Sequence, residues 1–345
     1  MLLKNKVKQM DPTELEEKLS QAVIIFRFIT DKDVFNNFYL KLMTTRLLQD
    51  QSTSADAEGS IISKLKECCG VEYSSKLQRV YQDIRLSEEL DGLFKNAVDM
   101  SIELTVKVIS GSASPFGNVN CTFTIPEELG SGISSYQAFY INKHQGRKLT
   151  WVYAKSRGDI QYRCPNGKNF VFTASVFQMA IMLLFNRYDE MSIEDIQKNT
   201  DIKVELLVQI LKIFLKVKLL LCVASTKDES ELKATDVMKL NTNYKNKKLR
   251  ININVPIKTV DKEDDERTHR QIDESRKFVI EAAIVRIMKM RKSLKHQELV
   301  GEVLNHIGAK FSPTVPMIKK GIEELIQREY LERDATTRDV LNYLA

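Results

Sequence analysis

The sequence predicts a mainly helical protein with an α+β segment in its middle. Three observations support this fold class: helical spacing of apolar residues from Pro12 to about Ala97, an alternating pattern that begins near Met100, and a return to helical spacing at Val176. Apolar residues three or four positions apart share one face of a helix, whereas alternating ones share one face of a strand. We therefore expect a helical bundle, then an α/β domain, then further helical domains.

The composition is that of an ordinary globular protein of several domains, with 345 residues, 43% of them hydrophobic and 28% charged. The longest apolar stretch, from Val176 to Phe185, is about half as long as a membrane span, so we expect no membrane association. The five cysteines lack metal-binding or disulfide spacing, which indicates a reducing compartment, the cytoplasm and nucleus. The net charge of +6 permits an acidic partner without requiring nucleic acid.

The N-terminal half divides into two regions. Residues 1–97 are expected to form a helical bundle, because long helical patterns are separated by short polar joints. Residues 98–172 are expected to be an α+β segment. Its first strand is predicted from alternating apolar residues, namely Ile102, Leu104, Val106 and Val108. Further strands are predicted at residues 121–125, 149–153, 160–163 and 170–172.

A repeat in the C-terminal half predicts two related domains. The apolar spacing of residues 207–220 recurs at residues 318–331, in each case as a helix that leads into a short strand. Two helices, a third helix and a hairpin are the plan of a winged helix. We therefore predict winged-helix domains at residues 173–236 and 261–345.

The region between the two copies is predicted to serve other parts of the chain. Residues 237–260 contain an alternating apolar pattern and are expected to return as strands to the α+β domain. Residues 261–266 are acidic and poor in apolar side chains, so they are expected to form a loose tether to the last domain.

The sequence contains no pattern typical of a catalytic centre. It has no complete phosphate-binding glycine loop, and its four histidines lack metal-ligand spacing. Cys68 and Cys69 are expected at a helix end, where packed or partly exposed thiols are more common than catalytic ones. We therefore expect a non-enzymatic protein with no cofactor and no metal.

Nucleic-acid binding is the alternative function, because winged helices often place their third helix in DNA. Each third helix here carries lysines, but each also carries glutamates that phosphate would repel. The residues concerned are Lys203, Lys212, Lys216 and Glu205 in the first copy, and Lys319, Lys320, Glu323 and Glu324 in the second.

The helix expected from Glu274 to Lys292 is the most informative element. Lys289 falls nearly opposite its apolar face, so periodicity alone indicates an ordinary solvated lysine. At about 100° per residue, the apolar face is predicted to contain Val279, Ile280, Ala283, Ile284, Ile287 and Met290.

Several motifs in this chain resemble those of the cullins. The stretch Ile-Val-Arg-Ile-Met-Lys-Met-Arg-Lys at residues 284–292 resembles the cullin modification-site motif, and residues 330–345 resemble the cullin C-terminus. Further matches lie at residues 31–35, 63–66, 146–151 and 177–180. The resemblance covers essentially the whole chain and is closest to the C-terminal half of a cullin-1-type protein.

The resemblance implies a non-catalytic scaffold of a multi-subunit RING ubiquitin ligase. By this resemblance, Lys289 accepts the ubiquitin-like modifier that is attached in neddylation, and Lys292 is the nearest rival acceptor. Modification is expected to bias the last domain between packed and released states. The resemblance also implies binding of an exchange factor and a deneddylating complex, whereas substrate adaptors cannot be assigned to this part of a cullin.

Two further surfaces are implied. A strand of the RING-box protein is expected to add to the strand-rich segment, with these candidate contacts: Ile102, Leu104, Val106, Val108 and Trp151. The same residues could equally be core of their own domain. A basic run could steer an acidic tail of the ubiquitin-conjugating enzyme, or simply be a solvated strand entrance. It comprises Lys245, Lys247, Lys248 and Arg250.

Overall fold

A computed structural model describes residues 3, 11–116, 123–165, 167–223, 232–255, 258–337 and 339–344. The chain forms two compact units. The first unit comprises residues 1–84, 109–115 and 259–345, and the second comprises residues 85–108 and 116–258. The predicted fold class, mainly helical with an α+β segment and two winged helices, is confirmed.

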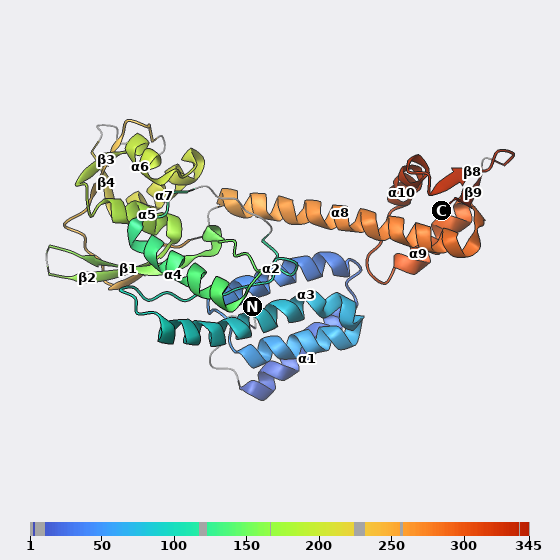
Figure 1. Cartoon of the computed structure of the whole chain (residues 1–345), viewed down its shortest axis with the longest axis horizontal. Helices are drawn as coiled ribbons and strands as arrows, with labels where there is room; N and C mark the ends of the chain where they lie inside the picture. Colours follow the sequence, from blue (N-terminus) through green and yellow to red (C-terminus); the bar gives the residue numbers. More distant parts are fainter. Residues whose placement is uncertain are drawn as a thin grey trace. The chain divides into compact units, whose positions relative to one another are not determined.

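The N-terminal helices of the first unit are α1 (Pro12–Arg27), α2 (Lys32–Leu48) and the first part of α3 (Ala55–Ala97) (Figure 1). Asp11 caps α1, because its carboxylate accepts from the amide of Thr13. Gly70 interrupts α3 with φ 86°, a backbone conformation that favours glycine. The three helices enclose one hydrophobic core, which includes Leu19, Met43, Leu65, Leu77 and Val80.

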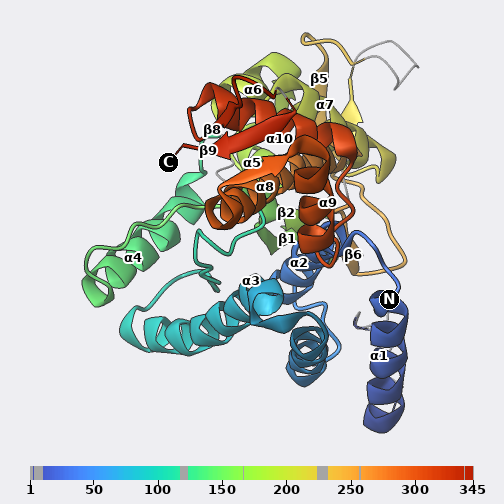
Figure 2. The ribbon, with the colours of Figure 1, turned by 90° about the vertical axis from the view of Figure 1, so that its right-hand side faces the viewer.

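The C-terminal part of the first unit is a winged helix. In Figures 1 and 2, two shorter helices lie beside the C-terminal end of a long one. The elements are α8 (Lys258–Arg291), β7 (Ser293–Lys295), α9 (His296–Ile307), α10 (Val315–Gln327), β8 (Leu331–Arg333) and β9 (Val340–Tyr343). The strands form an antiparallel sheet in the order β7-β9-β8.

The second unit contains a mixed sheet. It is built from β1 (Arg157–Arg163), β2 (Asn169–Ser175) and β6 (Arg250–Asn252), with β2 in the centre. Strand β1 is antiparallel to β2, whereas β6 is parallel to it. The unit also contains the end of α3, α4 (Glu127–Lys143) and the short 3-10 helix η2 (Tyr153–Lys155).

The first winged helix continues directly from β2. Its elements are α5 (Val176–Leu184), β3 (Glu190–Ser192), α6 (Ile193–Thr200), α7 (Val204–Lys216), β4 (Leu220–Cys222) and β5 (Val237–Leu240). Strand β5 pairs with both β3 and β4, so this domain extends beyond residue 236, the boundary that the sequence predicts. Of the predicted return strands, only β6 joins the mixed sheet.

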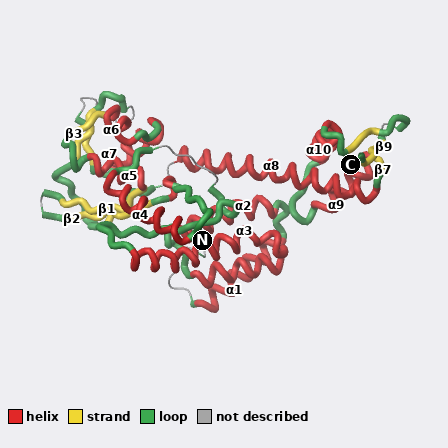
Figure 3. The backbone as a smooth tube through the Cα atoms, viewed as in Figure 1, coloured by secondary structure: helices red, strands yellow, loops and turns green. Residues whose placement is uncertain are grey.

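The prediction of a strand from Ile102 to Val108 is wrong. The segment lies in the long loop between α3 and α4, and it pairs with no strand of the described chain (Figure 3). Two of its amides instead donate to side chains of α3: Val106 to Asp91 Oδ1 at 3.4 Å and Val108 to Ser87 Oγ at 2.8 Å. The amides of Val106 and Val108 are thus satisfied by side chains of α3 and not by a neighbouring strand.

Other predicted strands also differ. Residues 149–152 are loop and lead into η2, and residues 123–125 are loop, while residues 121 and 122 lie outside the described residues. The sequence reasoning missed α4, although Tyr136 and Tyr140 are one helical turn apart. Strands β1 and β2, in contrast, cover the predicted residues 160–163 and 170–172.

The loose tether predicted at residues 261–266 is wrong, because these residues belong to α8. Carboxylates near the N-terminal end of a helix interact favourably with its dipole. Asp265 also accepts from Lys41 Nζ on α2 at 2.8 Å.

Within the described ranges, none of the helices combines the length and the apolar character that a bilayer crossing requires.

Candidate modification site

Lys289 lies in the last turn of α8, and its side chain is exposed. The opposite face is buried, as predicted, but Met290 is not part of it, since 70% of its surface is exposed. Residues three, four, seven and eight positions after Ile280 lie on the same side of the helix, and Met290 is not one of them. These residues are all buried, namely Ala283, Ile284, Ile287 and Met288.

The end of α8 is held in place by the adjoining sheet. Lys292 ends the helix with φ 66°, and its amide donates to the carbonyl of Met288 at 2.8 Å. The amide of Tyr343 donates to the carbonyl of Lys292 at 2.9 Å, and β7 begins at the next residue. Lys289 therefore projects from a helix turn that ends in backbone hydrogen bonds to α8 and to β9.

The cations around Lys289 are engaged by other side chains. Arg291 pairs with Glu302 at 3.0 Å, and Arg286 contacts His306 at 3.3 Å. The ammonium of Lys292 lies 5.2 Å from the ring centre of Tyr343, a cation–π distance. The side chain of Lys289 has no ion pair or hydrogen bond with any described residue. Of the two candidate acceptors, Lys289 is the one whose amine is not held.

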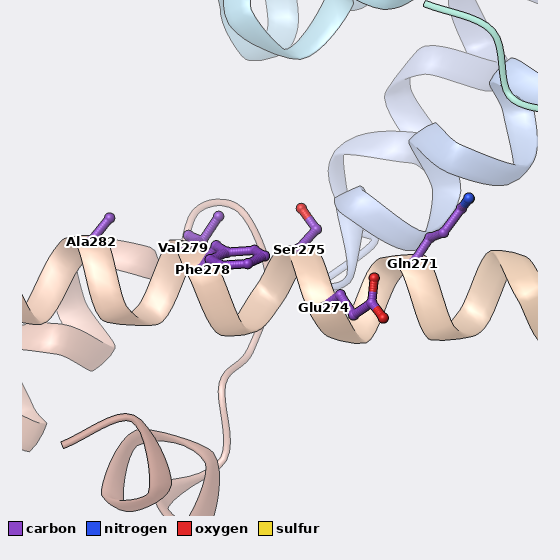
Figure 4. Close-up of a pocket in the computed structure, with 6 residues that line it drawn as sticks. All are labelled: Gln271, Glu274, Ser275, Phe278, Val279 and Ala282. Carbon is purple, nitrogen blue, oxygen red and sulfur yellow. The ribbon is translucent and has the colours of Figure 1, made fainter. Parts of the chain in front are cut away.

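Several side chains lie on the same solvent-facing side of α8 as Lys289. At about 100° per residue, Gln271, Phe278, Ala282 and Lys289 fall on the same side of the helix. Phe278 is 64% exposed. An open depression runs along this side and is lined by Gln271, Glu274, Ser275, Phe278, Val279 and Ala282 (Figure 4).

The structure brings most of the RING-box candidates into one hydrophobic cluster of the second unit. Val106 is buried with Phe94, Tyr136 and Tyr140, and these candidates pack against that cluster: Leu104, Val108 and Trp151. Ile102 is half-buried close to Gly132 of α4. The burial of Val106 agrees with the interpretation as domain core, and the half-buried candidates keep part of their surface available.

Trp151 also carries an unsatisfied donor. Its ring meets that of Tyr136 edge to face, with 6.1 Å between the ring centres. Its Nε1 atom is buried and has no hydrogen-bond partner among the described residues. Sequence reasoning did not single out Tyr136, which lies at the centre of this cluster on the unpredicted helix α4.

The basic run leads into β6, of which Arg250 is the first residue, and all four of its side chains are exposed. Arg250 pairs with Asp159, and the hydrogen bond from Thr173 together with Arg250 lowers the pKa of Asp159. The adjacent Tyr244 anchors the segment, since its ring is buried against Phe170 and Phe172. Three solvent-facing lysines remain for a partner: Lys245, Lys247 and Lys248.

The third helix of the C-terminal winged helix has a mixed charge. Glu324 pairs with Lys277 at 2.5 Å and with Arg328 at 3.5 Å, and the hydrogen bond from Lys277 lowers the pKa of Glu324. Glu323 pairs with Arg333. Both carboxylates lie on the same helix as Lys319 and Lys320, so α10 does not present a one-sided basic face to phosphate.

Three family models match consecutive parts of the chain. The cullin alpha solenoid domain matches residues 1–91, the cullin alpha+beta domain residues 108–244, and the cullin protein neddylation domain residues 275–337. The chain belongs to the cullin family. Lys289 lies inside the matched neddylation domain, as do the helices α9 and α10 that pack beside it.

Several curated cullins align over the whole of this chain. Cullin-1 of Schizosaccharomyces pombe is 41% identical over 350 residues, and cullin-1 of Dictyostelium discoideum is 39% identical over 352. Cullin-1 of Caenorhabditis elegans is 37% identical over 350 residues. The alignments cover 100% of this chain but only 45%, 46% and 45% of these relatives, so the chain spans less than half their length.

One of the solved structures similar to this chain is titled "A Dual E3 Mechanism for Rub1 Ligation to Cdc53: Dcn1(P)-Cdc53(WHB)" and is 38% identical. The match covers 24% of this chain and 93% of that chain, with a TM-score of 0.23.

Proposed function

We propose that this chain is the C-terminal part of a non-catalytic scaffold of a cullin-RING ubiquitin ligase, and that Lys289 is its neddylation acceptor. The observation that carries the proposal is the exposed, unpaired Lys289 side chain in the matched neddylation domain. The scaffold contributes proximity, because it holds a charged conjugating enzyme near a substrate bound elsewhere. The expected locations are the cytoplasm and nucleus.

The chemistry of modification suits Lys289 better than its neighbours. The neutral ε-amine attacks the thioester carbonyl of the charged enzyme, an isopeptide bond forms, and the enzyme's thiolate leaves. The attacking amine must reach the carbonyl and shed a proton. A side chain without a partner meets these needs, whereas that of Lys292 must first leave the ring of Tyr343.

The RING-box protein is proposed to add a strand beside residues 102–108. The segment from Ile102 to Val108 lacks a strand partner in the described chain, and α3 side chains hold it on one side. Main-chain hydrogen bonds from a partner strand would then supply affinity. The buried Nε1 of Trp151 is a further donor that a partner carbonyl could satisfy.

Three other partners belong to the same proposal. The lysines Lys245, Lys247 and Lys248 would attract an acidic tail of the ubiquitin-conjugating enzyme. An exchange factor and a deneddylating complex would act on the same scaffold.

Modification at Lys289 is proposed to shift the C-terminal winged helix between packed and released states. Differential hydrogen exchange of residues 261–345 would report this shift.

The first experiment is co-expression of the chain with a RING-box protein, followed by a neddylation assay. The wild type should form a stable complex and accept one modifier, because Lys289 is the candidate of the motif at residues 284–292 whose amine has no side-chain partner, whereas that of Lys292 lies against Tyr343. Lys289→Arg keeps the charge but removes the acceptor amine, so modification should be lost. Lys292→Arg is the matched control and should be modified at the wild-type rate.

The assay separates the possible outcomes. Normal modification of Lys289→Arg would contradict the assignment of the acceptor. Absence of both a complex and modification would contradict the scaffold proposal, and a DNA-binding test of the two winged helices would follow.

A further inference from the structure

Polar side chains connect the helical bundle of the first unit to its C-terminal winged helix. The two parts have separate hydrophobic cores, one around Met43 and Leu77 and the other around Ile284 and Ile318, with no residue in common. The segment of α8 between them, residues 265–276, belongs to neither core. Each part thus has a hydrophobic core of its own. Ile272 in this segment is also buried, at 3% exposed, and polar side chains supply further contacts between the two parts.

Arg276 of α8 makes the most extensive of these interactions. Its guanidinium grips Asp33 with two hydrogen bonds, Nε to Oδ2 at 2.6 Å and Nη2 to Oδ1 at 2.8 Å. The same Nη2 lies 3.2 Å from Asp31 Oδ1. The guanidinium carbon also sits 4.7 Å from the ring centre of Phe311, which follows α9.

The setting of Arg276 makes these contacts strong. Its side chain is only 14% exposed, and that of Asp33 is 23% exposed, so water screens the pair poorly. The hydrogen bonds to Asp33 raise the pKa of Arg276, which keeps its charge fixed. A planar bidentate pair that is also stacked on an aromatic ring requires arginine and not lysine.

The remaining contacts are weaker. Lys310 pairs with Glu72 at 3.1 Å, but these side chains are 54% and 86% exposed. Exposed pairs of this kind contribute little to stability. The ring of His269 meets that of Phe38 at 5.3 Å between centres, next to the Asp265 contact already described. Arg276 therefore makes the most extensive polar contact between the two parts.

We propose that Arg276, Asp31, Asp33 and Phe311 form an ionic latch that holds the C-terminal winged helix on the helical bundle. When the latch opens, the winged helix and its part of α8 leave the bundle with both hydrophobic cores intact. The latch then sets how far Lys289, 13 residues further along α8, can travel from the bundle. The inference does not depend on Lys289 being modified, because it concerns the unmodified chain.

A zero-length carbodiimide can report the docked state in the full chain. It couples amines to adjacent carboxylates, so the docked state should yield the Lys310–Glu72 cross-link, quantified by mass spectrometry. The Lys239–Glu190 pair, at 2.6 Å within the first winged helix, is an internal reference. We expect Arg276→Ala to lower the ratio of the two cross-links at least about tenfold, since it leaves the carboxylate of Asp33, only 23% exposed, without its bidentate partner.

Three comparisons test the cause of that loss. Arg270→Ala, which removes an exposed arginine of the same helix, should leave the ratio unchanged. Arg276→Asp combined with Asp33→Arg reverses the charges and should restore part of the ratio. Arg276→Lys keeps the charge but removes the planar bidentate geometry, so it should lower the ratio in part.

The results decide the proposal even if one variant fails to fold. A circular dichroism melt identifies such a variant, and the milder Arg276→Lys substitution tests the same contact. An unchanged cross-link ratio in folded Arg276→Ala, or in Arg276→Lys if the alanine variant does not fold, would overturn the latch.

Discussion

Asp334 shapes the turn between β8 and β9, the wing of the C-terminal winged helix. Its carboxylate accepts from the amides of Thr336 and Thr337 at 2.9 and 2.8 Å, and from the hydroxyl of Thr336. These hydrogen bonds favour the ionised form and lower the pKa of Asp334 to about 2. The carboxylate of Asp334 thereby adds to the backbone hydrogen bonds that close the turn, from Asp334 to Val340 and from Val340 to Thr337.

The lowered pKa of Asp334 predicts how the wing responds to acid. Because the folded pKa lies below the unfolded value of about 3.9, the carboxylate stabilises the turn fully above that pH. This contribution is lost as the pH falls through about 2. NMR of the Thr336 and Thr337 amides should show an acid transition near pH 2, and Asp334→Ala should remove it. A midpoint near 4 would contradict the role of these hydrogen bonds.

At the scale of elements, Gly321 sets the distance between α8 and α10. A Cβ atom at this position would lie 3.2 Å from Ile280 Cγ2 and 3.3 Å from Ile284 Cδ1. These isoleucines belong to the core of the winged helix and have no free space. The absence of a side chain at Gly321 thus allows the helix that carries Lys289 to pack closely on α10.

Gly321→Leu should force α8 and α10 apart. We expect a loss of about 1–3 kcal/mol in the free energy of unfolding, the usual cost of overpacking a core. Urea denaturation followed by circular dichroism measures the change. Gly301→Leu on α9 is the matched control, because open space surrounds Gly301, and it should be neutral or stabilising. Equal stability of the two variants would contradict close packing at Gly321.

At the scale of the whole molecule, a net charge of +6 is mild, so local clusters decide where an acidic partner binds. Lys245, Lys247 and Lys248 should accelerate association with an acidic conjugating-enzyme tail at low salt. Stopped-flow measurements should show a rate that falls steeply with ionic strength, and a slope that flattens when all three are alanine. Lys203→Ala, an exposed lysine of α7, should leave the slope unchanged. A salt-independent wild-type rate would exclude steering.

Local patterns predicted much of this molecule. The helices of the bundle and both winged helices follow from apolar spacing, because each helix buries one face whatever lies further along the chain. The exposed position of Lys289 follows from the same spacing. Met290 was misplaced by that reasoning, since only the packing of α9 and α10 defines which side of α8 is covered.

Non-local partners account for what the sequence did not predict. Residues 102–106 do alternate between less and more exposed side chains. However, Asp91 and Ser87 accept from the amides of Val106 and Val108, which a neighbouring strand would otherwise pair. The acidic residues after 260 read as a tether, but they are helical. Arg276 gave no signal at all, because its partner Asp33 is 243 positions away.

The sequence by itself determined the order of domains, the family and the exposure of Lys289, because these depend on local spacing and on motifs within short stretches. Only the tertiary structure decided that Lys289 is free while Lys292 lies against Tyr343, and that an arginine joins the winged helix to the bundle. Such contacts depend on distances between residues far apart in the chain, and folding alone brings those residues together.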